Sequence, residues 1–161
     1  MTAQRRPRAR PDVAAKQKLR LWLRLLRASR ATETELRRRL AREFGTTLPK
    51  FDVMAALARK DAGMTMTELS RFLMVSNGNV TGIIDRLVAE GQVMRLAHEG
   101  DRRATFVRLT RVGAQSFQAM AAAHEAWVGE LLAGIDAPQT EQMIKQLDGL
   151  TADIHHGGRG K

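Results

Sequence analysis

Between Thr67 and Thr110 the spacing of apolar residues changes from helical to alternating, and this change limits the chain to a small set of folds. A first helix is predicted after Thr67, its expected N-cap, with an apolar stripe of Leu69, Phe72 and Leu73. The tripeptide at 76–78 breaks that helix and caps a second one, whose predicted buried stripe is Val80, Ile83, Ile84, Leu87 and Val88. Gly91 ends the second helix, and alternation over 92–96 and 104–109 predicts two short strands around a polar tip.

Two helices followed by a hairpin form the layout of a winged helix-turn-helix, and the exposed residues of this layout suit DNA. Short hydrogen-bonding side chains at the start of a helix fit the major groove, and an arginine at a hairpin tip fits the neighbouring minor groove. The predicted DNA-binding residues are Ser76, Asn77, Asn79, Thr81 and Arg86 on the second helix, and His98, Asp101, Arg102 and Arg103 at the tip. Many small helical domains share the helix pair without touching DNA, and their exposed Asn and Arg are simply solvated. The arginine-tipped hairpin favours the DNA-binding interpretation.

A motif at the tip carries a family resemblance. Residues 101–113 read Asp-Arg-Arg-Ala-Thr-Phe-Val-Arg-Leu-Thr-Arg-Val-Gly, close to the pattern D-x-R-x-x-x-x-x-L-T-x-x-G. In this motif, and over nearly its whole length, the chain resembles the MarR family of bacterial transcriptional regulators. The resemblance implies that Arg103 enters the minor groove and that Asp101 orients it. Asn77–Gly78–Asn79 replaces the Ser/Thr-rich entry that is commoner in the family, so no base preference is implied.

The predicted fold is mainly α with a small β-wing, that is, a winged helix-turn-helix embedded in a helical dimerisation domain. We predict a disordered basic N-terminal arm at 1–12, a first dimerisation helix at 13–48 with its helical pattern ending near Phe44, the winged DNA-binding domain at 49–110, C-terminal dimerisation helices at 111–155 and a disordered tail at 156–161. Residues 134–138 are expected to separate the two closing helices, the last of which is predicted from Gln139 to about Ile154, and residues 64–66 are expected to add a short third strand. The resemblance implies a homodimer with interlocked helices, and a twofold dimer implies a palindromic operator.

Composition excludes several functions. Without cysteine the chain has no disulfide framework, thiol redox sensor or Cys-based zinc site, and its four histidines lack a supporting carboxylate pattern, so no metal site is predicted. No apolar run approaches the ~20 residues of a membrane span, and no signal peptide is recognisable, which makes a cytoplasmic location without a membrane partner the expectation. P-loop, Rossmann and nucleophile-elbow patterns are absent, so we expect neither an enzyme nor a cofactor.

The net charge of +10 lies mostly on the predicted first helix. Residues 13–50 hold eleven basic and three acidic side chains, whereas residues 51–110 hold eight and seven. Guanidinium groups bind phosphate oxygens well, so we interpret this surface as part of an effector site made of Arg20, Trp22, Arg24, Arg27, Arg38 and Met54. Two other interpretations stay open. The face is either solvated, with Trp22 in the dimer interface, or it makes additional contacts with DNA phosphates.

The class of effector comes from a second resemblance. Residues 21–27, 51–54 and 73–82 resemble the branch of the family that responds to aromatic acids or their coenzyme A thioesters, such as p-coumaroyl-CoA. A CoA thioester carries several phosphate charges and a flat acyl group, which fits arginines around a tryptophan. We therefore predict a ligand-responsive regulator, most simply a repressor that a small-molecule effector releases from double-stranded DNA. The alternatives are a regulator that responds to a free phenolic acid and a non-specific nucleic-acid-binding architectural protein.

Overall fold

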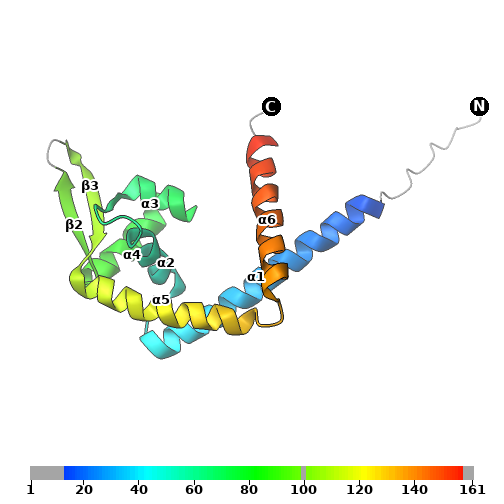
Figure 1. Cartoon of the computed structure of the whole chain (residues 1–161). Coiled ribbons are helices and arrows are strands. Elements are labelled where there is room, and N and C mark those ends of the chain that lie inside the picture. The colour runs from blue at the N-terminus through cyan, green and yellow to red at the C-terminus, as the bar shows by residue number, and fades with distance from the viewer. Residues whose placement is uncertain (1–12, 99–100, 158–161) are drawn as a thin grey trace, which may run out of the picture.

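The computed structural model describes the backbone of residues 13–98 and 101–157 and the side chains of residues 13–96 and 106–154. In chain order the elements are α1 (Val13–Phe44), α2 (Leu48–Leu57), β1 (Met64–Thr65), α3 (Met66–Leu73), α4 (Asn77–Ala89), β2 (Val93–His98), β3 (Asp101–Leu109), α5 (Arg111–Leu131) and α6 (Ala137–Gly157). Helices α2 to α4 and the three strands form a winged domain at one end of α5, while α1 crosses the other end of α5 (Figure 1).

The winged domain has one continuous apolar core to which the end of α1 also contributes. Leu40 of α1, Met54 of α2, Leu69 of α3, Ile84 of α4 and Val107 of β3 are each at most 1% exposed and belong to the same cluster. The C-terminal part of α1 is therefore packed against the winged domain. A ligand or partner that moves α1 would act on this domain through the shared core.

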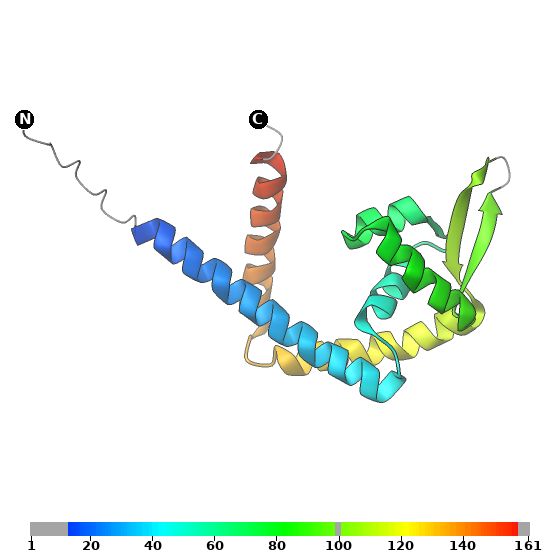
Figure 2. The same cartoon turned by 180° about the vertical axis from the view of Figure 1, so that it is seen from behind.

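The sheet is small and antiparallel, with strand order β1–β3–β2. Met64 pairs with Val107 and Val93 with Leu109. The short strand predicted at 64–66 is thus confirmed at Met64–Thr65, while Met66 begins α3. Both flanking strands are thus held by β3. The wing extends from the end of α4 and the start of α5 (Figures 1 and 2).

The N-cap of α3 corrects one sequence prediction. Thr65, not Thr67, is the cap: its hydroxyl accepts a bond from the Glu68 N–H at 3.1 Å, and the Glu68 carboxylate accepts one from the Thr65 N–H at 2.8 Å. This reciprocal capping box needs Thr and Glu three residues apart, which Thr65 satisfies and Thr67 does not. Thr67 instead lies inside the first turn of the helix.

The last helix is longer at both ends than predicted. It begins at Ala137, so Pro138 lies in the first turn instead of in the linker, where its missing N–H costs no helical hydrogen bond. Asp136 caps this turn, because its carboxylate accepts a bond from the Gln139 N–H at 2.8 Å while the Gln139 side chain accepts one from the Asp136 N–H.

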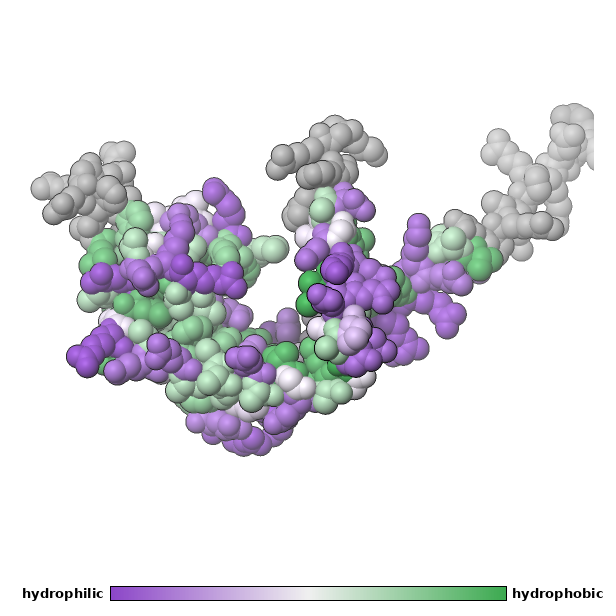
Figure 3. Space-filling model, viewed as in Figure 1, coloured by the Kyte–Doolittle hydropathy of each residue, from purple (hydrophilic) through white to green (hydrophobic). Residues whose placement is uncertain are grey.

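Two segments project from the molecule and keep apolar faces uncovered. The N-terminal half of α1 extends beyond α5, and α6 stands away from the winged domain in both views (Figures 1 and 2). Figure 3 shows hydrophobic patches on both segments next to hydrophilic surface. The exposed apolar side chains on them are Val13, Leu19, Leu21, Trp22 and Leu23 on α1, and Met143, Ile144, Leu147, Leu150 and Ile154 on α6. Within one chain each of these residues is at least 42% exposed.

Candidate nucleic-acid interface

Helix α4 is fixed at both ends by its own sequence. Ser76 is the N-cap, and its hydroxyl accepts a bond from the Asn79 N–H at 3.4 Å. At the other end Gly91 adopts φ +69°, and bonds from the Gly91 N–H to the Val88 carbonyl and from the Gln92 N–H to the Leu87 carbonyl close the helix. This pairing is a Schellman motif, which confirms Gly91 as the terminating glycine.

One face of α4 is buried, and the residues predicted to bind DNA lie on its exposed face or at its N-cap. Val80, Ile84 and Leu87 are at most 1% exposed. The five helical residues assigned to DNA are all exposed: Ser76, Asn77, Asn79, Thr81 and Arg86. The Thr81 hydroxyl donates a bond to the Asn77 carbonyl at 2.9 Å, so toward a base or phosphate it offers mainly its acceptor lone pairs.

The wing strands are longer than predicted. His98 ends β2 and pairs with Asp101, which begins β3, and the register shifts between Ala97 and His98. Residues 101–103 were expected in a loop but belong to β3, where Asp101 pairs with His98, because backbone pairing in a solvent-facing ribbon does not need apolar side chains. The side chains of His98, Asp101, Arg102 and Arg103 lie outside the described residues, and their contribution to DNA binding stays a prediction.

An ion pair that the sequence did not suggest joins α4 to the wing. The Arg95 guanidinium of β2 donates a hydrogen bond of 2.6 Å to the Asp85 carboxylate of α4. Both side chains are partly exposed, Arg95 at 39% and Asp85 at 55%. The two residues are ten positions apart on different elements, so periodicity gave no signal for the pair.

The structure separates the predicted effector residues. Met54 is 1% exposed in the core of the winged domain, whereas Arg20, Trp22, Arg24 and Arg27 are exposed on the projecting half of α1. Arg38 binds Glu35, and bonds from Arg38 and Arg39 lower the pKa of Glu35 to about 2. Within one chain, the residues assigned to the acyl group and those assigned to phosphates therefore do not meet.

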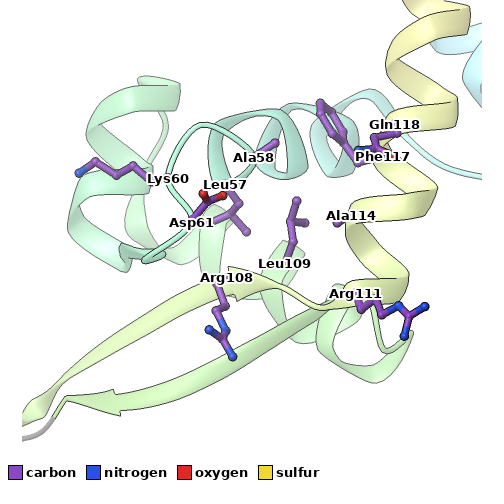
Figure 4. Close-up of a pocket in the computed structure, with 10 residues that line it drawn as sticks. All are labelled: Leu57, Ala58, Lys60, Asp61, Arg108, Leu109, Arg111, Ala114, Phe117 and Gln118. Carbon is purple, nitrogen blue, oxygen red and sulfur yellow. The ribbon is translucent and has the colours of Figure 1, made fainter.

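Two surface grooves could accept a small molecule. The larger, about 730 Å³, lies between α1, α2 and α4, and is lined among others by Arg37, Pro49, Asn79, Ile83 and Arg86. The second, about 570 Å³, lies between the end of α2, β3 and the start of α5 (Figure 4). In that groove Phe117 and Leu109 form apolar walls, and the Arg108 and Arg111 guanidinium groups point away from them. Of these two grooves, the larger alone includes residues of α4.

Comparisons with known proteins agree with this geometry. A family model described as the MarR family matches residues 46–105. The chain is 32% identical to a MarR family transcriptional regulator from Silicibacter pomeroyi, with a TM-score of 0.76 over 89% of this chain and 99% of that one. The chain belongs to the MarR family. Its mainly helical fold with a small β-wing is thereby confirmed, as is the expectation of a regulator instead of an enzyme.

Two further relatives bear on function. The transcriptional activatory protein BadR from Rhodopseudomonas palustris is 36% identical over 91 residues, which cover 55% of this chain and 52% of BadR. The match therefore spans about half the length of that relative. A mutant of E. coli MarR, solved in complex with operator DNA, is 25% identical with a TM-score of 0.74, covering 86% of this chain and 98% of that one.

Two further findings, on membrane-spanning helices and on metal sites, apply to the part of the chain that the structure describes. Across residues 13–98 and 101–157, no helix combines the length and the apolar character needed to cross a membrane. The described side chains also contain no group of three or more His, Asp or Glu residues placed to hold a metal ion.

Proposed function

We propose that this protein is a DNA-binding transcriptional regulator that inserts the start of α4 into the major groove and the wing into the adjacent minor groove. The observation that carries this proposal is the exposed polar start of α4, with Asn77, Asn79 and Thr81, in a domain whose wing strand β3 contains Arg102 and Arg103. Amides can read adenine edges in the major groove, and arginine is favoured in narrow minor grooves. That the related E. coli protein was solved in complex with operator DNA supports DNA binding by this chain.

The proposed functional unit is a twofold dimer. The uncovered apolar faces of α1 and α6 are the surfaces that a second copy would bury, and exposed apolar patches of this kind mark association sites. A twofold axis would place two α4 helices on one DNA face, at half-sites about 34 Å apart or a multiple of that spacing. The expected operator is therefore a palindrome.

The proposed effector site is the 730 Å³ groove between α1 and α4. A ligand there would touch the dimerisation helix through Arg37 and the recognition helix through Asn79 and Arg86. The Arg86 guanidinium favours an anionic ligand, whereas Arg37 is paired with Glu33 at 3.3 Å, and Pro49 and Ile83 offer apolar contact to a flat ring. Such a ligand would change the position of α4 relative to α1 only by binding one arrangement more tightly than the other. Release from DNA, as in a repressor, is the expected result.

The identity of the ligand forms the finer part of the proposal. We propose an aryl-CoA thioester, with the aromatic acyl group in the groove and the CoA phosphates on Arg20, Arg24 and Arg27 of α1. Among the described residues these three arginines form no salt bridge, unlike Arg38, so they are available to an anion. A free phenolic acid would need only the groove and would not involve these arginines.

A fluorescence-anisotropy titration tests the proposal step by step. The protein is titrated onto labelled DNA from the region upstream of its own gene and onto a scrambled duplex, at one fixed salt concentration because phosphate contacts are salt-dependent. Preference for the promoter DNA, lost in an Asn77→Ala/Asn79→Ala variant, is expected. Equal affinity for both duplexes would contradict sequence-specific regulation and favour an architectural role.

The effector is tested on the same complex with p-coumaroyl-CoA, free p-coumarate and free CoA. Release by the thioester alone, abolished by Arg20→Glu/Arg24→Glu/Arg27→Glu, is the expected result. Release by free p-coumarate, unchanged in this triple variant, would replace the thioester with a phenolic acid. Tighter promoter binding with the thioester would mean an activator, the sign that BadR carries in its name.

A further inference from the structure

The exposed side of the recognition helix carries opposite charges next to each other. Asp85 and Arg86 are the two ionisable residues of α4, both are exposed, and both lie in its C-terminal half, with Arg86 in the last turn. If α4 enters the major groove, Asp85 lies close to two rows of phosphates. A carboxylate in that position repels DNA unless a cation neutralises it.

Arg95 is the cation that meets this carboxylate. It comes from β2, where its backbone pairs with Val107, and its guanidinium Nη2 donates to the Asp85 Oδ1 at 2.6 Å. With both partners partly exposed, this contact adds little to folding stability, as is usual for surface ion pairs. Any larger consequence must therefore arise where the pair meets another charged surface.

We infer that Arg95 is a positioning residue of the DNA interface, which binds and neutralises Asp85 so that α4 approaches the phosphates without an uncompensated negative charge. The inference rests on the proposed DNA-binding function. In this arrangement Arg86 is the net positive charge of the helix, while Arg95 acts through Asp85 and makes no phosphate contact of its own. The wing thus has two roles: Arg95 neutralises a charge of α4, and the wing tip enters the minor groove.

Three variants of the full-length chain test this role on the promoter duplex and the scrambled duplex. Arg95→Gln leaves Asp85 unpaired and should lower promoter affinity on the order of three- to tenfold. Asp85→Asn removes the repulsive charge and should keep affinity within about twofold of wild type, and the double variant should recover most of the loss. Arg42→Gln is the matched control, because it removes one guanidinium from an exposed ion pair with Glu43 on α1.

Each other pattern overturns the inference. If Arg95→Gln weakens binding, Asp85→Asn does not rescue it and the slope of log affinity against log salt falls by about one, then Arg95 binds a phosphate directly. A loss caused by Asp85→Asn alone would make Asp85 a base-reading residue. If Arg95→Gln and Arg42→Gln lower promoter affinity equally, the effect comes from the change in net charge and not from the Asp85–Arg95 pair. Failure of the wild type to prefer promoter DNA would instead contradict the proposed function, and the wild-type titrations alone reveal it.

Discussion

Gly113→Ala should disrupt the junction between the wing and α5. An ideal Cβ at this position would lie 1.8 Å from the Gln92 carbonyl oxygen and 2.7 Å from the Gln92 carbonyl carbon. Both atoms belong to the backbone, and the same carbonyl accepts bonds from the Thr110 N–H at 3.0 Å and from the Thr110 hydroxyl at 3.2 Å. No side-chain rotation relieves this overlap. The start of α5 must move away from the Gln92 backbone, which breaks the contact between the two segments.

The magnitude follows from this geometry. Overpacking of a well-packed site costs about 1–3 kcal/mol and sometimes more, and the overlap here is with rigid backbone, so we expect a loss of at least about 3 kcal/mol in unfolding free energy. This exceeds the ~1 kcal/mol that alanine gains over glycine within a helix. For a chain of this length the unfolding midpoint should fall by roughly 6–12 °C.

Gly82→Ala is the matched control, because no heavy atom lies within 4 Å of the added Cβ. Only the helix propensity changes there, so the unfolding midpoint should rise by roughly 2–4 °C. Both variants are compared with wild type by urea and thermal unfolding, followed by circular dichroism at one fixed protein concentration, since association shifts the midpoint. A Gly113→Ala variant as stable as wild type would refute the reasoning.

Three further predictions concern the capping box, the α1–α5 junction and the proposed dimer. Glu68→Gln should lower stability at neutral pH but not at low pH. Bonds from the Thr65 N–H and from Lys60 lower the folded-state pKa of Glu68 from its ordinary 4.5 to about 2. The stabilisation by the Glu68 carboxylate is therefore present above pH 4.5 and lost as the pH falls toward 2. The urea midpoints of variant and wild type should converge over that range, and a constant gap would contradict the assignment. Arg39→Ala should lower the thermal midpoint, because Arg39 binds Glu35 and Glu130 and lies 5.9 Å from the centre of the Trp127 ring, whereas Arg42→Ala should leave it unchanged. Ile144→Glu/Leu147→Glu should convert dimer to monomer in sedimentation velocity while Gln142→Glu does not; an unchanged mass would exclude α6 from the interface.

The comparison of sequence and structure shows which features are local. The period of the apolar residues was enough to place α4 and its buried stripe, because Val80, Ile84 and Leu87 recur at one face of any helix they form. Gly91 was equally readable, since a positive φ at a helix end strongly favours glycine. The N-cap of α3 is also encoded locally, by the three-residue spacing of Thr65 and Glu68, although Thr67 was predicted as the cap.

Other features depend on contacts between distant parts of the chain. Met54 matched an effector residue by composition, yet packing against α1 and the sheet places it in the core. Asp85 and Arg95 meet only because the Schellman turn brings β2 back beside α4, and no periodicity connects two residues on different elements. The sequence by itself determined the order of helices and strands, which faces are apolar and that the chain belongs among DNA-reading proteins, since these depend on residue type and near neighbours. The tertiary structure alone decided which charges pair, which groove touches the recognition helix and which apolar faces are left uncovered, because each depends on the relative positions of whole elements in space.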